Sequence, residues 1–60
     1  MDDMVTLREM ETAGTFGAVW ENVLELDPDA TEDEMNETIV SYAYSEYGVP
    51  HQVTRAYLDL

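Results

Sequence analysis

The stretch TFGAVWENVLEL, residues 15–26, contains the most regular apolar pattern in this 60-residue sequence. Its apolar side chains recur at intervals of three and four positions, which places them along one face of an α-helix. We expect a helix over 15–26 with Thr15 as its N-cap. Asp27 and Pro28 should end it, because a residue before proline is pushed out of the α region. The apolar stripe consists of Phe16, Val19, Trp20, Val23 and Leu24.

A second helix is expected after this proline. Thr31 and Glu34 have the spacing of a capping box, in which the two side chains bond reciprocally to the helix backbone. The pattern predicts a helix over 31–47 that ends at Gly48, because glycine readily adopts the left-handed conformation that follows a helix. The composition of residues 38–44 is also typical of a short strand, but the spacing favours the helix. Its expected apolar face consists of Met35, Ile39, Tyr42, Ala43 and Tyr47.

Two shorter helices are expected at the ends of the sequence. Thr6 opens another capping-box pattern, which predicts a first helix over about 6–12. Pro50 suits the first turn of a last helix over about 50–59, since its missing N–H group is not needed there. The apolar face expected for that last helix consists of Val53, Ala56, Tyr57 and Leu60.

Length and composition limit the size and class of the fold. A chain this short buries only about 60% of the surface that its unfolded form exposes. The hydrophobic content of 45% nevertheless argues against disorder. Residues 1–60 therefore predict a single all-α domain, a small bundle of three to four short helices. No apolar run approaches the ~20 residues of a membrane span. Asp2 and Asp3 stand where a signal peptide would carry positive charge, so we expect a cytoplasmic protein without membrane contact.

Charge is the unusual property of this chain. It contains 14 acidic residues, two arginines and no lysine, for a formal net charge of −12. Twelve of the acids lie within residues 1–37, so the acidity belongs to one part of the sequence. A surface of this kind repels nucleic acid and anionic membranes, and it attracts basic clefts. We therefore expect no direct binding to nucleic acid.

Helix electrostatics explains only part of this acidity. The acids at 32–34 lie in the first turn of an expected helix, where each is favoured by ~0.3–1 kcal/mol. In contrast, the like-charge pairs Glu21/Glu25 and Asp33/Glu37 each destabilise a helix by ~0.2–0.5 kcal/mol. Members of a pair lie ~6 Å apart along the helix axis. We expect the pairs, continued through the intervening acids, to form one anionic band that suits a partner rather than the fold.

Catalytic and metal-binding motifs are missing from the sequence. Residues 27–38 imitate an EF-hand calcium loop, but Glu32 replaces its glycine and Thr38 replaces its bidentate glutamate. His51 is the only histidine, and it follows Pro50 in what reads as a loop. The chain has no cysteine, which excludes thiolate zinc sites and cysteine nucleophiles. We expect no enzymatic activity, no metal and no cofactor.

A small, lysine-free, strongly acidic helical chain resembles the phage-encoded DNA-mimic inhibitors, among them anti-CRISPR and anti-restriction proteins. The resemblance covers the composition and the acidic residues 21–37. It implies a non-enzymatic inhibitor that acts in the host cytoplasm. Such a protein binds a basic nucleic-acid-binding protein or complex of the host and blocks access to its cleft. The expected contacts are Glu21, Glu25, Asp27, Asp29, Asp33 and Glu37, with Tyr44 and Tyr47 as auxiliary contacts.

Two other interpretations remain open. The first is a small domain adapted to high salt, because halophilic proteins are acidic and poor in lysine. The nearly neutral segment 38–60 fits this interpretation less well, since adaptation to solvent should acidify every exposed face. The second is a homodimeric protein–protein interaction module that uses the tyrosine-rich C-terminal half, where association would relieve the limits of a small core. A homodimer is also compatible with the inhibitor.

Folding measured by circular dichroism across salt concentrations separates the inhibitor from the halophilic domain. We expect the chain to remain folded in dilute buffer. A partner should bind most tightly there, because salt screens the attraction between exposed charges. Unfolding in dilute buffer, with refolding as salt is added, would instead identify a halophilic domain.

Overall fold

The structure, a computed structural model, describes residues 2–60. No strand occurs in this range, so residues 38–44 are helical and the expected all-α bundle is confirmed. The elements are α1 (Asp3–Thr12), α2 (Thr15–Leu26), α3 (Glu32–Tyr47) and α4 (His51–Tyr57).

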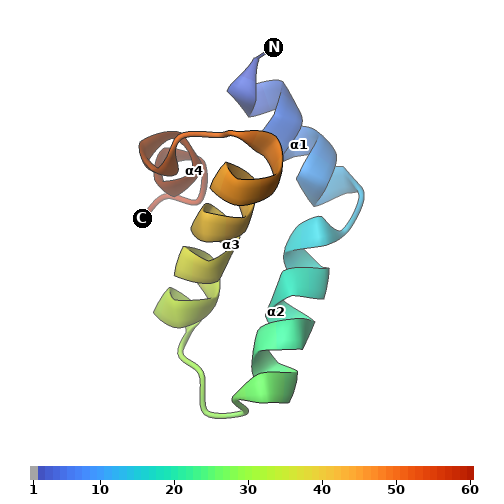
Figure 1. The fold of residues 1–60 in the computed structure, drawn as a ribbon, viewed down its shortest axis with the longest axis vertical. Coiled ribbons are helices and arrows are strands. Elements are labelled where there is room, and N and C mark those ends of the chain that lie inside the picture. The colour runs from blue at the N-terminus through green and yellow to red at the C-terminus, as the bar shows by residue number, and fades with distance from the viewer. Residues whose placement is uncertain (1) are drawn as a thin grey trace.

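The α2 and α3 helices form an antiparallel hairpin along the longest axis of the molecule (Figure 1). The α1 and α4 helices lie beside the half of this hairpin that is remote from the α2–α3 turn. The α1 helix packs against α2 and α4, and the α4 helix packs against α1 and α3. The extents are 35 × 21 × 18 Å. One end contains α1, α4, the start of α2 and the second half of α3, and we call it the four-helix end because all four helices contribute to it. The other end is a two-helix projection.

The core lies in the four-helix end. Leu7 and Met10 of α1 pack with Ala43 of α3 and with Val49, which follows α3. The partly buried side chains of Phe16, Val53 and Tyr57 pack against this cluster. Ile39 and Val40 extend the buried surface of α3 toward the projection. Full burial of each large aliphatic side chain stabilises the fold by ~1.5–3 kcal/mol.

Two of the three predicted N-caps are wrong. The α1 helix starts at Asp3 rather than near Thr6, because Asp2 caps it and accepts a hydrogen bond from the Met4 N–H at 2.9 Å. The α2 helix is preceded by Gly14 at φ 78°, a left-handed conformation that glycine adopts without strain, and Thr15 lies inside the helix. The predicted cap at Thr31 is confirmed: its hydroxyl accepts a hydrogen bond from the Glu34 N–H at 3.2 Å.

The end of α3 confirms the role predicted for Gly48. This residue has a φ of 69°, and its N–H donates to the Tyr44 carbonyl at 3.0 Å. The N–H of Val49 donates to the Ala43 carbonyl at 3.2 Å, and the Val49 side chain is fully buried. The glycine therefore caps α3 and returns the chain into the core. The α4 helix is shorter than the expected 50–59.

The apolar faces differ in part from those predicted. Tyr42 and Tyr47 are exposed, and the buried face of α3 includes Asn36 and Val40 in their place. This face is rotated because α3 packs against both α2 and α4. On α4, Thr54 is buried while Ala56 and Leu60 are exposed, and on α2 the side chain of Leu24 is also exposed.

One polar contact ties α1 to α4. The Tyr57 hydroxyl donates a hydrogen bond to Glu11, and the Tyr57 ring meets Phe16 edge-on with centroids 6.2 Å apart. The hydrogen bond to Glu11, followed by desolvation, raises the pKa of Tyr57 above its ordinary value. The stabilisation from this contact is complete below the unfolded pKa of ~10 and is lost as the pH rises through the higher folded pKa.

Truncation of a core residue should unfold a large share of the molecules. We expect Ile39→Ala to lower the free energy of unfolding by ~2–5 kcal/mol, because it leaves a cavity. The whole domain has only ~3–9 kcal/mol at this size. Leu26→Ala is the matched control, since the Leu26 side chain is 89% exposed, and its effect should stay within ~0.5 kcal/mol. Urea denaturation followed by circular dichroism measures both, and equal effects would contradict the placement of the core.

Candidate functional site

The projecting end of the hairpin carries most of the predicted contact residues. We call residues 21–37 the acidic tip; it comprises the second half of α2, the turn and the first turns of α3. No side chain from residue 24 to residue 34 is buried: Ala30 is partly buried, and the other residues of that stretch are exposed. The part of the acidic tip from residue 24 to residue 34 is therefore held by local backbone interactions, while Met35 and Asn36 at its end are buried.

Asp27 organises the turn between the two helices. Its N–H donates to the Val23 carbonyl at 2.8 Å, and its carbonyl accepts from the Ala30 N–H at 3.0 Å. One of its carboxylate oxygens accepts from the Asp29 N–H at 3.1 Å, which closes an Asx turn. The prediction that Asp27 ends α2 is confirmed. Its side-chain hydrogen bond within the turn is a further local role that was not predicted.

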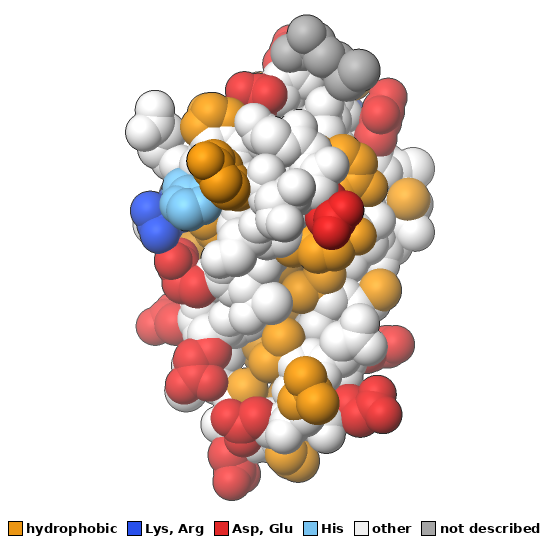
Figure 2. All heavy atoms as spheres, viewed as in Figure 1, with side chains coloured by type: hydrophobic (Ala, Val, Ile, Leu, Met, Phe, Trp, Pro, Cys, Tyr) orange, Lys and Arg blue, Asp and Glu red, His pale blue; other side chains and the backbone are white. Residues whose placement is uncertain are grey.

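The remaining acids occupy two flanks of the hairpin. Glu21 and Glu25 are exposed on α2, and Asp33 and Glu37 are exposed on α3. Figure 2 shows acidic side chains along both sides of the projecting end, with apolar side chains between them. The acids therefore form separate groups on two sides of the hairpin rather than the one anionic band that was expected. Glu21 and Glu25 lie opposite the buried stripe of α2. Asp33 and Glu37 instead border the buried face of α3 on the side of α4, where Glu37 pairs with Arg55.

The separation of the flanks follows from helix dimensions. Packed helices have axes 8–10 Å apart, and each helix with its side chains is 10–12 Å wide. The outer edges of the two packed helices are therefore about 20 Å apart, and this width is the upper limit for the distance between the two rows of carboxylates.

Arg55 is the one cation that pairs with the acidic tip among the described residues. Its Nη2 and Nε atoms donate to the two Glu37 carboxylate oxygens at 2.7 and 3.2 Å, a bidentate ion pair between α4 and α3. This hydrogen bonding lowers the pKa of Glu37 and raises that of Arg55. Within residues 2–60, the other carboxylates of the acidic tip form no ion pair. The negative charge of Glu37 is thus already compensated by Arg55.

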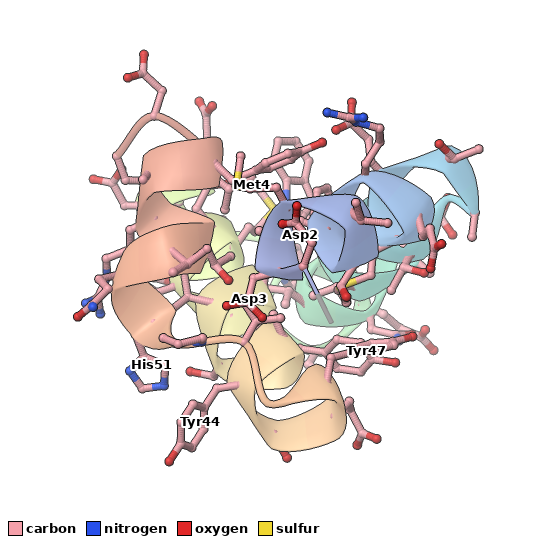
Figure 3. All side chains as sticks on the ribbon, turned by 90° about the horizontal axis from the view of Figure 1, so that it is seen from above. Asp2, Asp3, Met4, Tyr44, Tyr47 and His51 are labelled. Carbon is pink, nitrogen blue, oxygen red and sulfur yellow. The ribbon has the colours of Figure 1, made fainter. Side chains whose placement is uncertain are left out.

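Tyr44 and Tyr47 do not join the acidic tip. They lie at the opposite end of α3, and Tyr47 is ~21 Å from Asp33 along the helix axis. The two rings point to different sides of the helix (Figure 3). Tyr44 packs edge-on against His51 with ring centroids 4.6 Å apart, and the rings of Tyr47 and Tyr42 are tilted toward each other with centroids 6.2 Å apart. The predicted contact residues therefore divide into one acidic group and two separate tyrosines.

Tyr47 lines an open groove that the sequence analysis did not anticipate. This groove has a volume of about 320 Å³ and lies where α1, the start of α2 and the end of α3 meet. No periodic or spacing signal connects these segments, because they meet only through the fold. Its lining residues are Thr6, Glu9, Met10, Ala13, Thr15 and Tyr47.

Neither a metal cluster nor a membrane span is found in the described part of the chain. No group of three or more His, Cys, Asp or Glu side chains within residues 2–60 is arranged to hold a metal ion. None of the helices in this range combines the length and apolarity needed to cross a membrane. Comparisons with protein families, with curated proteins and with solved structures each find no match.

Neutralising acids at two positions should change stability in opposite directions. The folded pKa of Glu37 is lowered below 4.5. Its ion pair therefore stabilises the fold above that pH, and the stabilisation is lost as the pH falls through the lowered value. We expect Glu37→Gln to destabilise the protein at pH 7. The variant should also lack the part of the wild-type loss of stability at acidic pH that comes from protonation of Glu37.

The matched control for this experiment is Glu21→Gln. Within residues 2–60, Glu21 has no cationic partner, and it lies four residues from Glu25, so its neutralisation should leave stability unchanged or increase it. Urea denaturation at pH 7 and pH 3 measures both variants. Destabilisation of equal size in the two variants at pH 7 would contradict a specific role for the Glu37–Arg55 pair.

Proposed function

We propose that this protein is a non-enzymatic inhibitor that inserts its acidic tip into the basic nucleic-acid cleft of a host defence complex. This is the role of an anti-CRISPR-like phage protein acting in the host cytoplasm. The observation that carries the proposal is the pair of exposed acidic flanks on a two-helix projection. Among residues 2–60, Glu37 is the one carboxylate of this projection that has a cation beside it.

The shape of the projection supports occlusion of a cleft. Two packed helices form a rod that can enter a channel, while the four-helix end is wider and stays outside. Each wall of a duplex-binding channel carries arginine and lysine side chains that normally pair with one phosphate strand. Carboxylates on two sides of the projection offer anions to both walls at once. An inhibitor of this shape therefore competes for the same cations as the nucleic acid.

The absence of cations on the projection supports rapid and selective association. Carboxylates that form no ion pair within the protein are available to form ion pairs with a basic partner surface. Long-range attraction of this kind raises association rates and weakens steeply with salt. The same charge repels nucleic acid itself, so the proposal includes no direct contact with DNA or RNA.

The local construction of the acidic tip also fits this role. Backbone hydrogen bonds at Asp27 and Thr31 fix the turn without burying side chains. The positions between them are therefore free to carry acids without loss of core packing. A rigid turn limits the conformational entropy that would be lost on binding.

Reversing the charge of three flank acids should abolish binding to the target. The variant is Glu21→Lys, Glu25→Lys and Asp33→Lys, and the bait is the immobilised full chain in a host lysate at low salt. We expect the wild type to capture a basic nucleic-acid-binding complex that elutes as salt is raised. The triple variant should release it at markedly lower salt or fail to capture it, because rim charges control association and salt dependence.

A second triple variant provides a control with the same net charge. It reverses Asp3, Glu46 and Asp59, which lie outside the acidic tip. Circular dichroism verifies that both variants are folded. This control should retain capture with a smaller shift of the salt elution. Identical elution of the two variants would show that net charge, rather than the acidic tip, determines binding.

A further inference from the structure

The groove beside Tyr47 has a floor and a rim of different chemistry. Met10 is buried and supplies an apolar floor together with Ala13. Glu9 and Tyr47 stand at the rim as an exposed carboxylate and a half-exposed phenol ring. A volume of about 320 Å³ is at the lower end of the ~300–1,000 Å³ range of ligand pockets. The groove therefore suits a single side chain better than a large ligand.

The charge of the groove is uncompensated. In the described part of the chain, Glu9 makes no ion pair and no side-chain hydrogen bond. Its neighbour Arg8 points about 100° away around the helix. Arg8 acts instead on the α4 side of α1, where its charge opposes the rise in the pKa of Tyr57. An occupant that brings a positive charge to Glu9 meets no competing cation.

We propose that this groove binds an arginine side chain of the inhibited partner. The proposal rests on the proposed function, because a basic nucleic-acid cleft is rich in arginine. It adds a second contact, remote from the acidic tip, at the four-helix end.

Three features of arginine match the groove. Its aliphatic stem packs on an apolar floor such as Met10 and Ala13. Its guanidinium group donates to a carboxylate in a bidentate geometry, as Glu9 offers. Its flat face stacks on an aromatic ring, as Tyr47 offers, and it is more weakly hydrated than a lysine ammonium group. An apolar side chain would leave Glu9 without a partner.

A titration of the isotope-labelled full chain tests this contact without the partner. The probe is Nα-acetylarginine amide, followed by ¹H–¹⁵N NMR. We expect saturable shifts concentrated at the groove. The control ligand is Nα-acetylcitrulline amide, which has nearly the same shape without the charge and should bind much more weakly. The residues expected to shift are Thr6, Glu9, Met10, Ala13, Thr15 and Tyr47.

Three variants assign the contact to its residues. Glu9→Gln should abolish the preference for arginine over citrulline. Tyr47→Leu should weaken arginine binding about two- to five-fold, the effect of losing an exposed cation–π contact. Asp59→Asn removes an acid outside both the groove and the acidic tip and should leave binding unchanged. All three positions are exposed, so the fold should be retained.

Several results would overturn the proposal. They are equal binding of citrulline, unchanged selectivity in Glu9→Gln, and shifts centred on the acidic tip instead of the groove. The outcome is separable from that of the inhibitor hypothesis. If the acidic tip captures a basic complex but the groove does not bind the arginine probe, only the arginine contact is refuted. If the groove binds the arginine probe but no basic complex is captured, only the proposed partner is refuted.

Discussion

The buried face of α3 is the contact on which the rest of this structure depends. Ile39, Val40 and Ala43 are almost completely buried, and α3 packs against both α2 and α4. Gly48 then turns the chain so that Val49 enters the same core. Because most of this packing lies at one end of the hairpin, residues 24–34 at the other end contain no buried side chain. The molecule thus separates eight of its 14 acidic residues, those of the acidic tip, from most of its core.

This separation explains how so small a domain tolerates a net charge of −12. Carboxylates at the acidic tip are solvated, so their mutual repulsion is weakened by water and salt. The two flanks lie on different sides of a hairpin about 20 Å wide, and this width is well above the Debye length of ~8 Å at physiological ionic strength. The repulsion is therefore mainly within each flank. A single anionic band would have concentrated it on one side.

The sequence predicted the parts of the fold that depend on local signals. The helix over 15–26, the cap at Thr31 and the stop at Gly48 each follow from neighbouring residues. The cap of α1 was misassigned because Asp2 and Thr6 are both good N-caps. In the structure Asp2 is the cap, and Thr6 lies inside the helix, where its hydroxyl donates to the Asp2 carbonyl. The separate flanks and the groove could not be predicted, since both depend on which faces meet. Glu9 carries no local signal that distinguishes it from other surface acids.

The central claim is that the acidic tip and nucleic acid occupy the same cleft. Competition on the captured complex tests it most directly, with a fluorescent duplex or guide-paired strand as the reporter. The account predicts that increasing amounts of the protein displace the reporter, that the apparent Kd of the reporter rises in proportion, and that added salt weakens the effect. A stable ternary complex, in which reporter and protein are bound together without mutual loss of affinity, would contradict it.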